Sequence, residues 1–208
     1  VFHQMHPASQ GGWWLAAKEG LVYWNPSEKT TKIWTTADGL VANEILAVHE
    51  DDYGFLWLGC TSGLLFYNGY EDYLLEPDLI TGPVLSIQQH NDTLYAGSDN
   101  GYLYLVDLKM RKVIDSIVLN IESKISAVVV RSEELFIATY GDGLYVYNKQ
   151  TQNISPLSLA LSSRHIYEMV ELGKSEQIAI ASDRGIDLYN TSTGEIQTIE
   201  NLPDIIIT

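Results

Sequence analysis

The chain has 208 residues, 46% of them hydrophobic, and folding at this length buries roughly 70% of the unfolded chain's surface, which excludes wholesale disorder. The formal net charge of −15 argues against nucleic acid as a partner, because no basic stripe is available to neutralise phosphates. No run approaches the roughly 18 consecutive apolar residues of a membrane-spanning helix, so we expect no direct membrane insertion.

Composition also narrows the fold class. Thirteen Tyr and five Trp, together with sixteen Gly, favour strands and turns. The single cysteine, Cys60, can form neither an internal disulfide nor a zinc site of its own, and it leaves the cellular compartment open.

One pattern recurs five times along the chain. In each copy an apolar strand ends in small residues, a two-residue polar bend precedes a glycine, and an alternating strand follows, as in "FLWLGCTSGLLFYN" from Phe55 and "LFIATYGDGLYVYN" from Leu135. The glycines at this point, spaced 38 to 43 residues apart, are Gly20, Gly63, Gly101, Gly143 and Gly185. Hairpin turns of this kind need a positive φ, which glycine adopts without a Cβ penalty. We therefore interpret these glycines as structural.

Each repeat supplies two further strands. An apolar inner strand comes first, in chain order "VFHQMH", "EILAVHE", "PVLSIQQ", "KISAVVV" and "HIYEMVE", and a more polar outer strand comes last. Four strands in a period of about forty residues predict an all-β chain of β-propeller blades, each a four-stranded antiparallel sheet. We place the five blades at about 1–43, 44–82, 83–123, 124–164 and 165–203.

The final "DIIIT" at 204–208 has the pattern of an inner strand that begins a further blade. A propeller removes its sheet edges by closing into a ring, so we expect these blades to be part of a larger, seven-bladed propeller. A closed ring of five blades is the alternative.

One stretch carries a specific motif. Residues 36–64, "TADGLVANEILAVHEDDYGFLWLGCTSGL", resemble the two-component regulator propeller repeat, whose pattern runs Asp-Gly-Leu, Asn, an apolar strand, Asp-x-x-Gly-x-Leu-Trp-Ile-Gly-Thr and Gly-Leu. The matching residues are Asp38, Gly39, Leu40, Asn43, Ile45, Asp51, Gly54, Leu56, Trp57, Gly59, Gly63 and Leu64. Leu58 and Cys60 stand where the family has Ile and Thr. The last three repeats keep the glycines but lose the Trp and the Asp-x-x-Gly.

The resemblance implies a sensor without enzymatic activity or cofactor in this segment. In that family, propellers form the periplasmic part of hybrid histidine kinases, mainly of Bacteroidetes, and typically detect oligosaccharides. It therefore implies a periplasmic location, an oligosaccharide ligand and a kinase elsewhere in the parent chain. Further blades or a second propeller, and a second copy in a homodimer, are the other partners we expect.

The polar bends before the glycines are the candidate ligand site. In a propeller these turns share one face with the blade-to-blade connections, near the channel mouth. The candidate ligand-binding residues are Lys18, Glu19, Asp99, Asn100, Tyr140, Asp142, Asp183 and Arg184. Such carboxylates, amides and hydroxyls suit hydroxyl-rich ligands. The structural alternative is that turns simply prefer Asp, Asn and Ser.

Other residues invite competing interpretations. We predict that Trp57 is blade core, and that the neighbouring Trp13 and Trp14 point to opposite faces, so that one of them is core. His3 and His6 are three apart on a predicted strand, a poor pair for a metal, and we predict no metal site or catalytic group. Two other functions remain open: a scaffold that binds proteins through its rim, and a metal-dependent lyase that uses His165.

Overall fold

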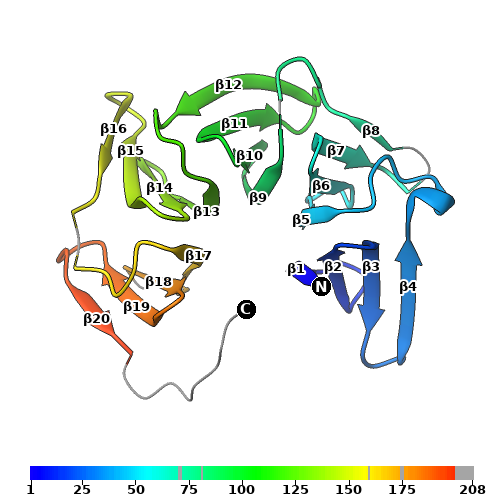
Figure 1. The fold of residues 1–208 in the computed structure, drawn as a ribbon, viewed down its shortest axis with the longest axis horizontal. Coiled ribbons are helices and arrows are strands. Elements are labelled where there is room, and N and C mark those ends of the chain that lie inside the picture. Colours follow the sequence, from blue (N-terminus) through cyan, green and yellow to red (C-terminus); the bar gives the residue numbers. More distant parts are fainter. Residues whose placement is uncertain (70–71, 81, 159, 174–175, 200–208) are drawn as a thin grey trace. The chain divides into compact units, whose positions relative to one another are not determined.

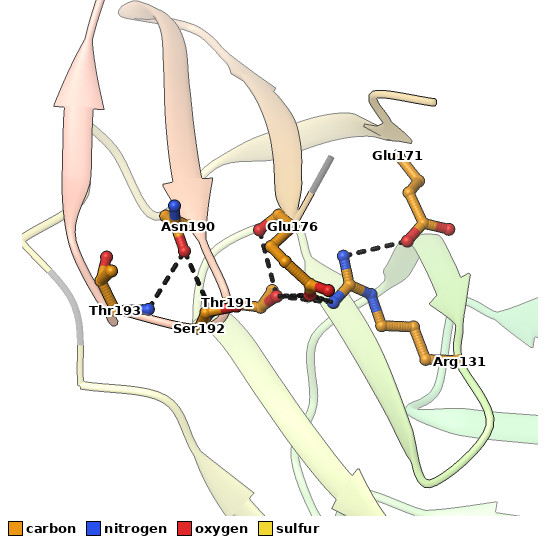
Figure 2. A network of polar contacts seen from close by, with 7 residues as sticks. All are labelled: Arg131, Glu171, Glu176, Asn190, Thr191, Ser192 and Thr193. Carbon is orange, nitrogen blue, oxygen red and sulfur yellow. Dashed lines mark hydrogen bonds and ion pairs between the residues drawn. The ribbon is translucent and has the colours of Figure 1, made fainter. Parts of the chain in front are cut away.

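The computed structural model describes residues 1–69, 72–80, 82–158, 160–173 and 176–199, and it divides into two compact units, residues 1–118 and 119–208. The first unit contains three four-stranded sheets and the second contains two. Every sheet is antiparallel and its strands lie side by side in chain order (Figure 1). The predicted all-β fold of four-stranded propeller blades is confirmed. The further blade predicted at 204–208 lies outside the described residues.

The first unit holds blades 1 to 3. Blade 1 consists of β1 (Phe2–Pro7), β2 (Trp13–Ala17), β3 (Gly20–Asn25) and β4 (Thr30–Trp34). Blade 2 consists of β5 (Ile45–Glu50), β6 (Leu56–Cys60), β7 (Gly63–Tyr67) and β8 (Asp72–Leu74). Blade 3 consists of β9 (Val84–His90), β10 (Thr93–Ser98), β11 (Tyr102–Asp107) and β12 (Lys112–Val118). A short 3-10 helix, η1 (Thr36–Asp38), connects the first two blades.

The second unit holds blades 4 and 5. Blade 4 consists of β13 (Ile125–Val130), β14 (Glu134–Thr139), β15 (Gly143–Asn148) and β16 (Asn153–Pro156). Blade 5 consists of β17 (Ile166–Glu171), β18 (Gln177–Ser182), β19 (Gly185–Asn190) and β20 (Ile196–Thr198).

The turn between the second and third strands has the geometry predicted for the recurring glycine. All five of these glycines have a positive φ, between 79° and 144°. At Gly20 a Cβ would also lie 2.1 Å from the carbonyl oxygen of Trp34, so the position admits no side chain. The small residue that ends the second strand closes the same turn: the hydroxyl of Thr139 donates to the carbonyl of Gly143 at 2.8 Å, and Ser98 bonds Tyr102 in the same way.

The residues of the family motif perform structural tasks. Asp38 accepts hydrogen bonds from the backbone and hydroxyl of Thr35, which caps η1, and Gly39 ends the helix with a φ of 107°. Asp51 is 5% exposed, and its carboxylate accepts from the indole Nε1 of Trp57 at 2.8 Å. The motif thus encodes a capped turn before blade 2 and a buried carboxylate-to-indole hydrogen bond, which ties the β5–β6 connection to β6.

The tryptophans follow the prediction. Trp57 is completely buried in the core formed with blade 3, where it contacts Phe66 edge to face at 5.1 Å. Trp14 is 7% exposed and belongs to the core formed between blades 1 and 2, whereas Trp13 is only half-buried. One tryptophan of the adjacent pair is therefore core, as expected.

Candidate functional site

The turn between β14 and β15 rests on the segment that leads into β17. Tyr140 forms an isolated antiparallel bridge with His165, and the amides of Gly141 and Gly143 both donate to the carbonyl of Arg164, at 3.0 and 3.3 Å. Three backbone contacts thereby hold a turn of blade 4 against the entry to blade 5. The side chains at this junction come from turns and connections whose backbones are bonded to each other.

Two predicted site residues, Tyr140 and Asp183, lie against the ring of His165 at this junction. The rings of Tyr140 and His165 meet edge to face at 5.0 Å, and Tyr140 and Tyr167 are tilted at 5.5 Å. A hydrogen bond with Tyr140 raises the pKa of Tyr167, with burial as the second cause. The carboxylate of Asp183 lies 3.8 Å from Nδ1 of His165. Because Tyr140 is 43% exposed, the cluster presents an aromatic face to solvent beside a carboxylate.

A pocket of about 650 Å³ adjoins this cluster, because Arg164, which lines it, directly precedes His165. The lining residues are Asp142, Gly143, Leu144, Tyr145, Pro156, Leu157, Ser158, Ala160, Leu161 and Arg164. Burial raises the pKa of Tyr145, and the charge of Asp142 adds to the rise while Arg164 opposes it. The hydroxyl of Ser123 donates to the Asp142 carboxylate, which holds that side chain in place. The pocket thus combines an acid, a guanidinium and a phenol.

The predicted residues of the first unit do not gather in this way. Lys18 and Glu19 form the β2–β3 turn, where the Glu19 carboxylate lies 3.8 Å from the amino group of Val1 and both are well exposed. Asp99 and Asn100 form the β10–β11 turn of another blade, and Asn100 accepts from the hydroxyl of Ser98 at 2.5 Å. This contact ties the turn to the end of β10.

Arg184 stands next to Asp183 in the β18–β19 turn, and its amide donates to the hydroxyl of Ser182. The structure adds side chains that the sequence reasoning left out of the ligand site: Arg164, His165, Tyr167 and Tyr145. Arg164, His165 and Tyr167 could have been found from their position in the repeat. The residues that lead into an inner strand lie at the same end of the blades as the turn between the second and third strands.

Among the described residues, no group of three or more His, Cys, Asp and Glu side chains is arranged to hold a metal ion. In the described part of the chain there is likewise no helix long and apolar enough to cross a membrane. The chemistry that the junction offers is stacking and hydrogen bonding, from exposed aromatic rings and from charged groups that can orient hydroxyls.

Comparison with known proteins agrees with the fold. The chain is similar to the extracellular domain of a protein described as a hybrid two component system from B. thetaiotaomicron, with a TM-score of 0.80, 20% identity, and coverage of 99% of this chain and 29% of that one. A second such domain from B. thetaiotaomicron has a TM-score of 0.75 and 23% identity, with coverage of 95% and 27%. The chain therefore spans less than a third of these structures.

The same fold occurs elsewhere: a chain of a mitotic checkpoint complex has a TM-score of 0.73 and 13% identity, with coverage of 93% of this chain and 64% of that one. No curated protein sequence matches the chain significantly. The family model described as "Two component regulator propeller" matches residues 39–62. The resemblance predicted from the sequence is thus confirmed over residues 39–62, which match the two-component regulator propeller repeat.

Proposed function

We propose that this chain is a ligand-sensing segment of the extracellular, periplasmic part of a two-component regulator. It binds an oligosaccharide and passes the signal to a histidine kinase outside these 208 residues. The repeat at residues 39–62 supports this proposal, as do the similar structures, which are extracellular domains of hybrid two component systems. A signal of this kind requires that the ligand bind one of two states more tightly.

The observation that carries the proposal is the junction of blades 4 and 5. The exposed ring of Tyr140 offers a stacking face for a sugar, and Asp183 offers a carboxylate that accepts from sugar hydroxyls. The adjoining pocket, with Asp142 and Arg164, has a volume of about 650 Å³, in the middle of the range of small-molecule sites. An extended ligand of a few sugar rings can therefore occupy both parts, with one ring on Tyr140 and another beside Arg164.

The test is calorimetric titration with a panel of oligosaccharides. Tyr140→Ala, Arg164→Ala and Arg184→Ala each change one polar or aromatic group at the exposed junction, so we expect them to abolish binding without unfolding the chain. Tyr53→Ala is the matched control, because Tyr53 is 50% exposed but belongs to the first unit and is not among the residues of the junction. Folded junction variants that bind every sugar as well as the parent chain does would refute the site.

Burial in blade 5 supports a second part of the proposal, a further blade as partner. In β14 five consecutive residues are buried, whereas β18 alternates between buried and half-buried positions. The half-buried face of blade 5 carries Ala179, Ala181, Ile186 and Leu188. Apolar sheet faces of this kind are normally covered by a neighbouring sheet. We expect a further blade of the parent chain to pack there.

A further inference from the structure

A second depression lies in the first unit, between blades 1 and 2, and has a volume of about 350 Å³. The ten residues that line it, named here the aromatic groove, are Gln10, Trp14, Tyr23, Lys32, Trp34, Gly54, Leu56, Tyr67, Asn68 and Gly69. The volume is at the lower end of the range for small-molecule sites. It suits a ligand of one or two rings.

The floor of the aromatic groove is rigid. The indole of Trp14 donates to Glu50 at 2.7 Å, and the hydroxyl of Tyr23 donates to the carbonyl of Gly11 at 2.5 Å. These two rings contact each other at 5.1 Å, and the half-buried ring of Trp34 contacts Trp14 at 5.7 Å. The polar atoms of Trp14 and Tyr23 are thus bonded inside the protein, and both rings are buried behind Trp34, whose half-buried ring offers the surface for a ligand. A pre-organised aromatic wall of this kind costs little conformational entropy on binding.

The described lining of the aromatic groove holds one charged side chain. Lys32 is the only charged residue among the ten, although the chain has a formal net charge of −15. Lys32 and Trp34 are two apart on β4 and therefore share a face, and Lys32 pairs in register with Tyr23. The Glu50 carboxylate also lies close to the groove, behind Trp14 and Gly54, but it accepts hydrogen bonds from Trp14 and Ser9. The Lys32 ammonium is therefore the charged group of the described lining that can meet a ligand.

We infer that the aromatic groove binds a sugar ring that carries a carboxylate, such as a uronic acid. The ring stacks on Trp34, its carboxylate pairs with Lys32, and the amides of Gln10 and Asn68 lie within the same lining to orient hydroxyls. This site uses no residue of the junction of blades 4 and 5 and lies in the other unit, so it does not depend on the ligand proposed there.

The test uses methyl β-D-glucuronide as the probe and methyl β-D-glucoside as its uncharged counterpart, with binding followed by tryptophan fluorescence and saturation-transfer NMR on the 208-residue chain. We expect a dissociation constant in the millimolar range for the glucuronide, because ligands of this size have limited affinity. We expect the glucoside to bind at least about fivefold more weakly, since it cannot pair with Lys32.

Two pairs of variants isolate the site. Lys32→Gln should weaken glucuronide binding at least about fivefold while Lys29→Gln, which changes a lysine outside the groove, should not. Trp34→Ala should abolish binding while Trp24→Ala, at a 42% exposed tryptophan outside the groove, should leave it intact. Circular dichroism establishes that the variants are folded.

The inference is overturned if the parent chain shows no saturable binding of the glucuronide, or if Lys32→Gln and Trp34→Ala bind it as the parent does. Equal binding of the two probes, with no effect of Lys32→Gln, also overturns it. Tyr140→Ala and Arg164→Ala separate this proposal from the junction site, because neither should change glucuronide binding in the aromatic groove.

Discussion

Replacement of Asp51 by alanine tests how the motif stabilises blade 2. The Asp51 carboxylate accepts three hydrogen bonds: from the indole of Trp57 at 2.8 Å, and from the amides of Tyr53 and Phe55, both at 2.9 Å. Water can replace the carboxylate at the backbone amides, because Tyr53 is 50% exposed. It cannot reach the indole of Trp57, which is completely buried.

The expected cost follows from this difference. A hydrogen bond to a charged group contributes about 1.5–3 kcal/mol, and a buried donor left without a partner costs about 1–3 kcal/mol. Release of the carboxylate from its buried position offsets part of the loss. We therefore expect Asp51→Ala to lower the free energy of unfolding by about 3–4 kcal/mol, a large share of the roughly 5–15 kcal/mol that holds a domain folded. Asp51→Asn keeps an acceptor for the amides but points an NH₂ at the indole, and should cost about 2–3 kcal/mol.

The assay is urea unfolding followed by far-ultraviolet circular dichroism, with a double-mutant cycle. In a Trp57→Phe background the indole donor is gone, so Asp51→Ala should cost about 1–2 kcal/mol less than in the parent. Asp52→Ala is the matched control, because Asp52 is an exposed neighbour that accepts a hydrogen bond from the side chain of Gln89 at 2.8 Å. If Asp51→Ala costs no more than Asp52→Ala, or if the coupling with Trp57 is absent, the reasoning is refuted.

Three further predictions concern packing and pH, all measured by the same urea assay. Gly59→Ala should destabilise by about 2 kcal/mol or more, because a Cβ there would lie 2.4 Å from a carbonyl oxygen of β9, and unchanged stability would contradict this close approach. Burial, with the charge of His49 second, lowers the pKa of His6 to about 4. The unfolded chain therefore takes up the proton first, so stability should be full above about pH 6.5 and fall towards pH 4, and His6 should contribute up to about 1.4 kcal/mol per pH unit. His6→Phe should reduce this slope, and His49, whose pKa burial also lowers, should keep part of it. Ala138→Glu places a carboxylate in a fully buried position and should lower the free energy of unfolding by about 3–5 kcal/mol. Ala181→Glu, at the equivalent half-buried position of blade 5, should lower it by under about 1 kcal/mol in this chain. Equal losses would mean that both faces are covered.

The blades could be predicted from sequence because their signals are local. The glycine at the start of each third strand indicates a turn with a positive φ, and the alternating strands on either side indicate which residues face inwards. The motif around Trp57 could be recognised for the same reason, since Asp51 and the indole that it binds are six residues apart.

The candidate site could be predicted only in part because it depends on contacts between blades. Tyr140 and Asp183 could be proposed from their turns, but the ring of His165, which contacts the first and lies 3.8 Å from the second, belongs to the connection between the blades. The periodicity of the sequence does not indicate which turn of one blade contacts which connection to the next. The aromatic groove beside Lys32 could not be predicted for a similar reason, since its lining includes Tyr67 of the next blade.

The structure also explains why only one repeat carries the full motif. A buried indole N–H requires an acceptor, and blade 2 supplies Asp51 from a connection long enough to fold back on Trp57. In blade 1 the equivalent indole, that of Trp14, has its acceptor in Glu50 of the neighbouring blade, so that repeat needs no Asp-x-x-Gly.

In blade 3 the equivalent position is Tyr95, which has no indole N–H to satisfy, and the connection between β9 and β10 shrinks to two residues with Asn91 at a φ of 53°. In blades 4 and 5 the position holds Phe136 and Ala179, which have no polar atom at all. In blades 3 to 5 the tryptophan and the acidic loop are both absent, because a side chain without an indole N–H does not require the acceptor that Asp51 supplies in blade 2. The motif that matches the family model thus satisfies one buried indole N–H in blade 2, and the other four blades form without it.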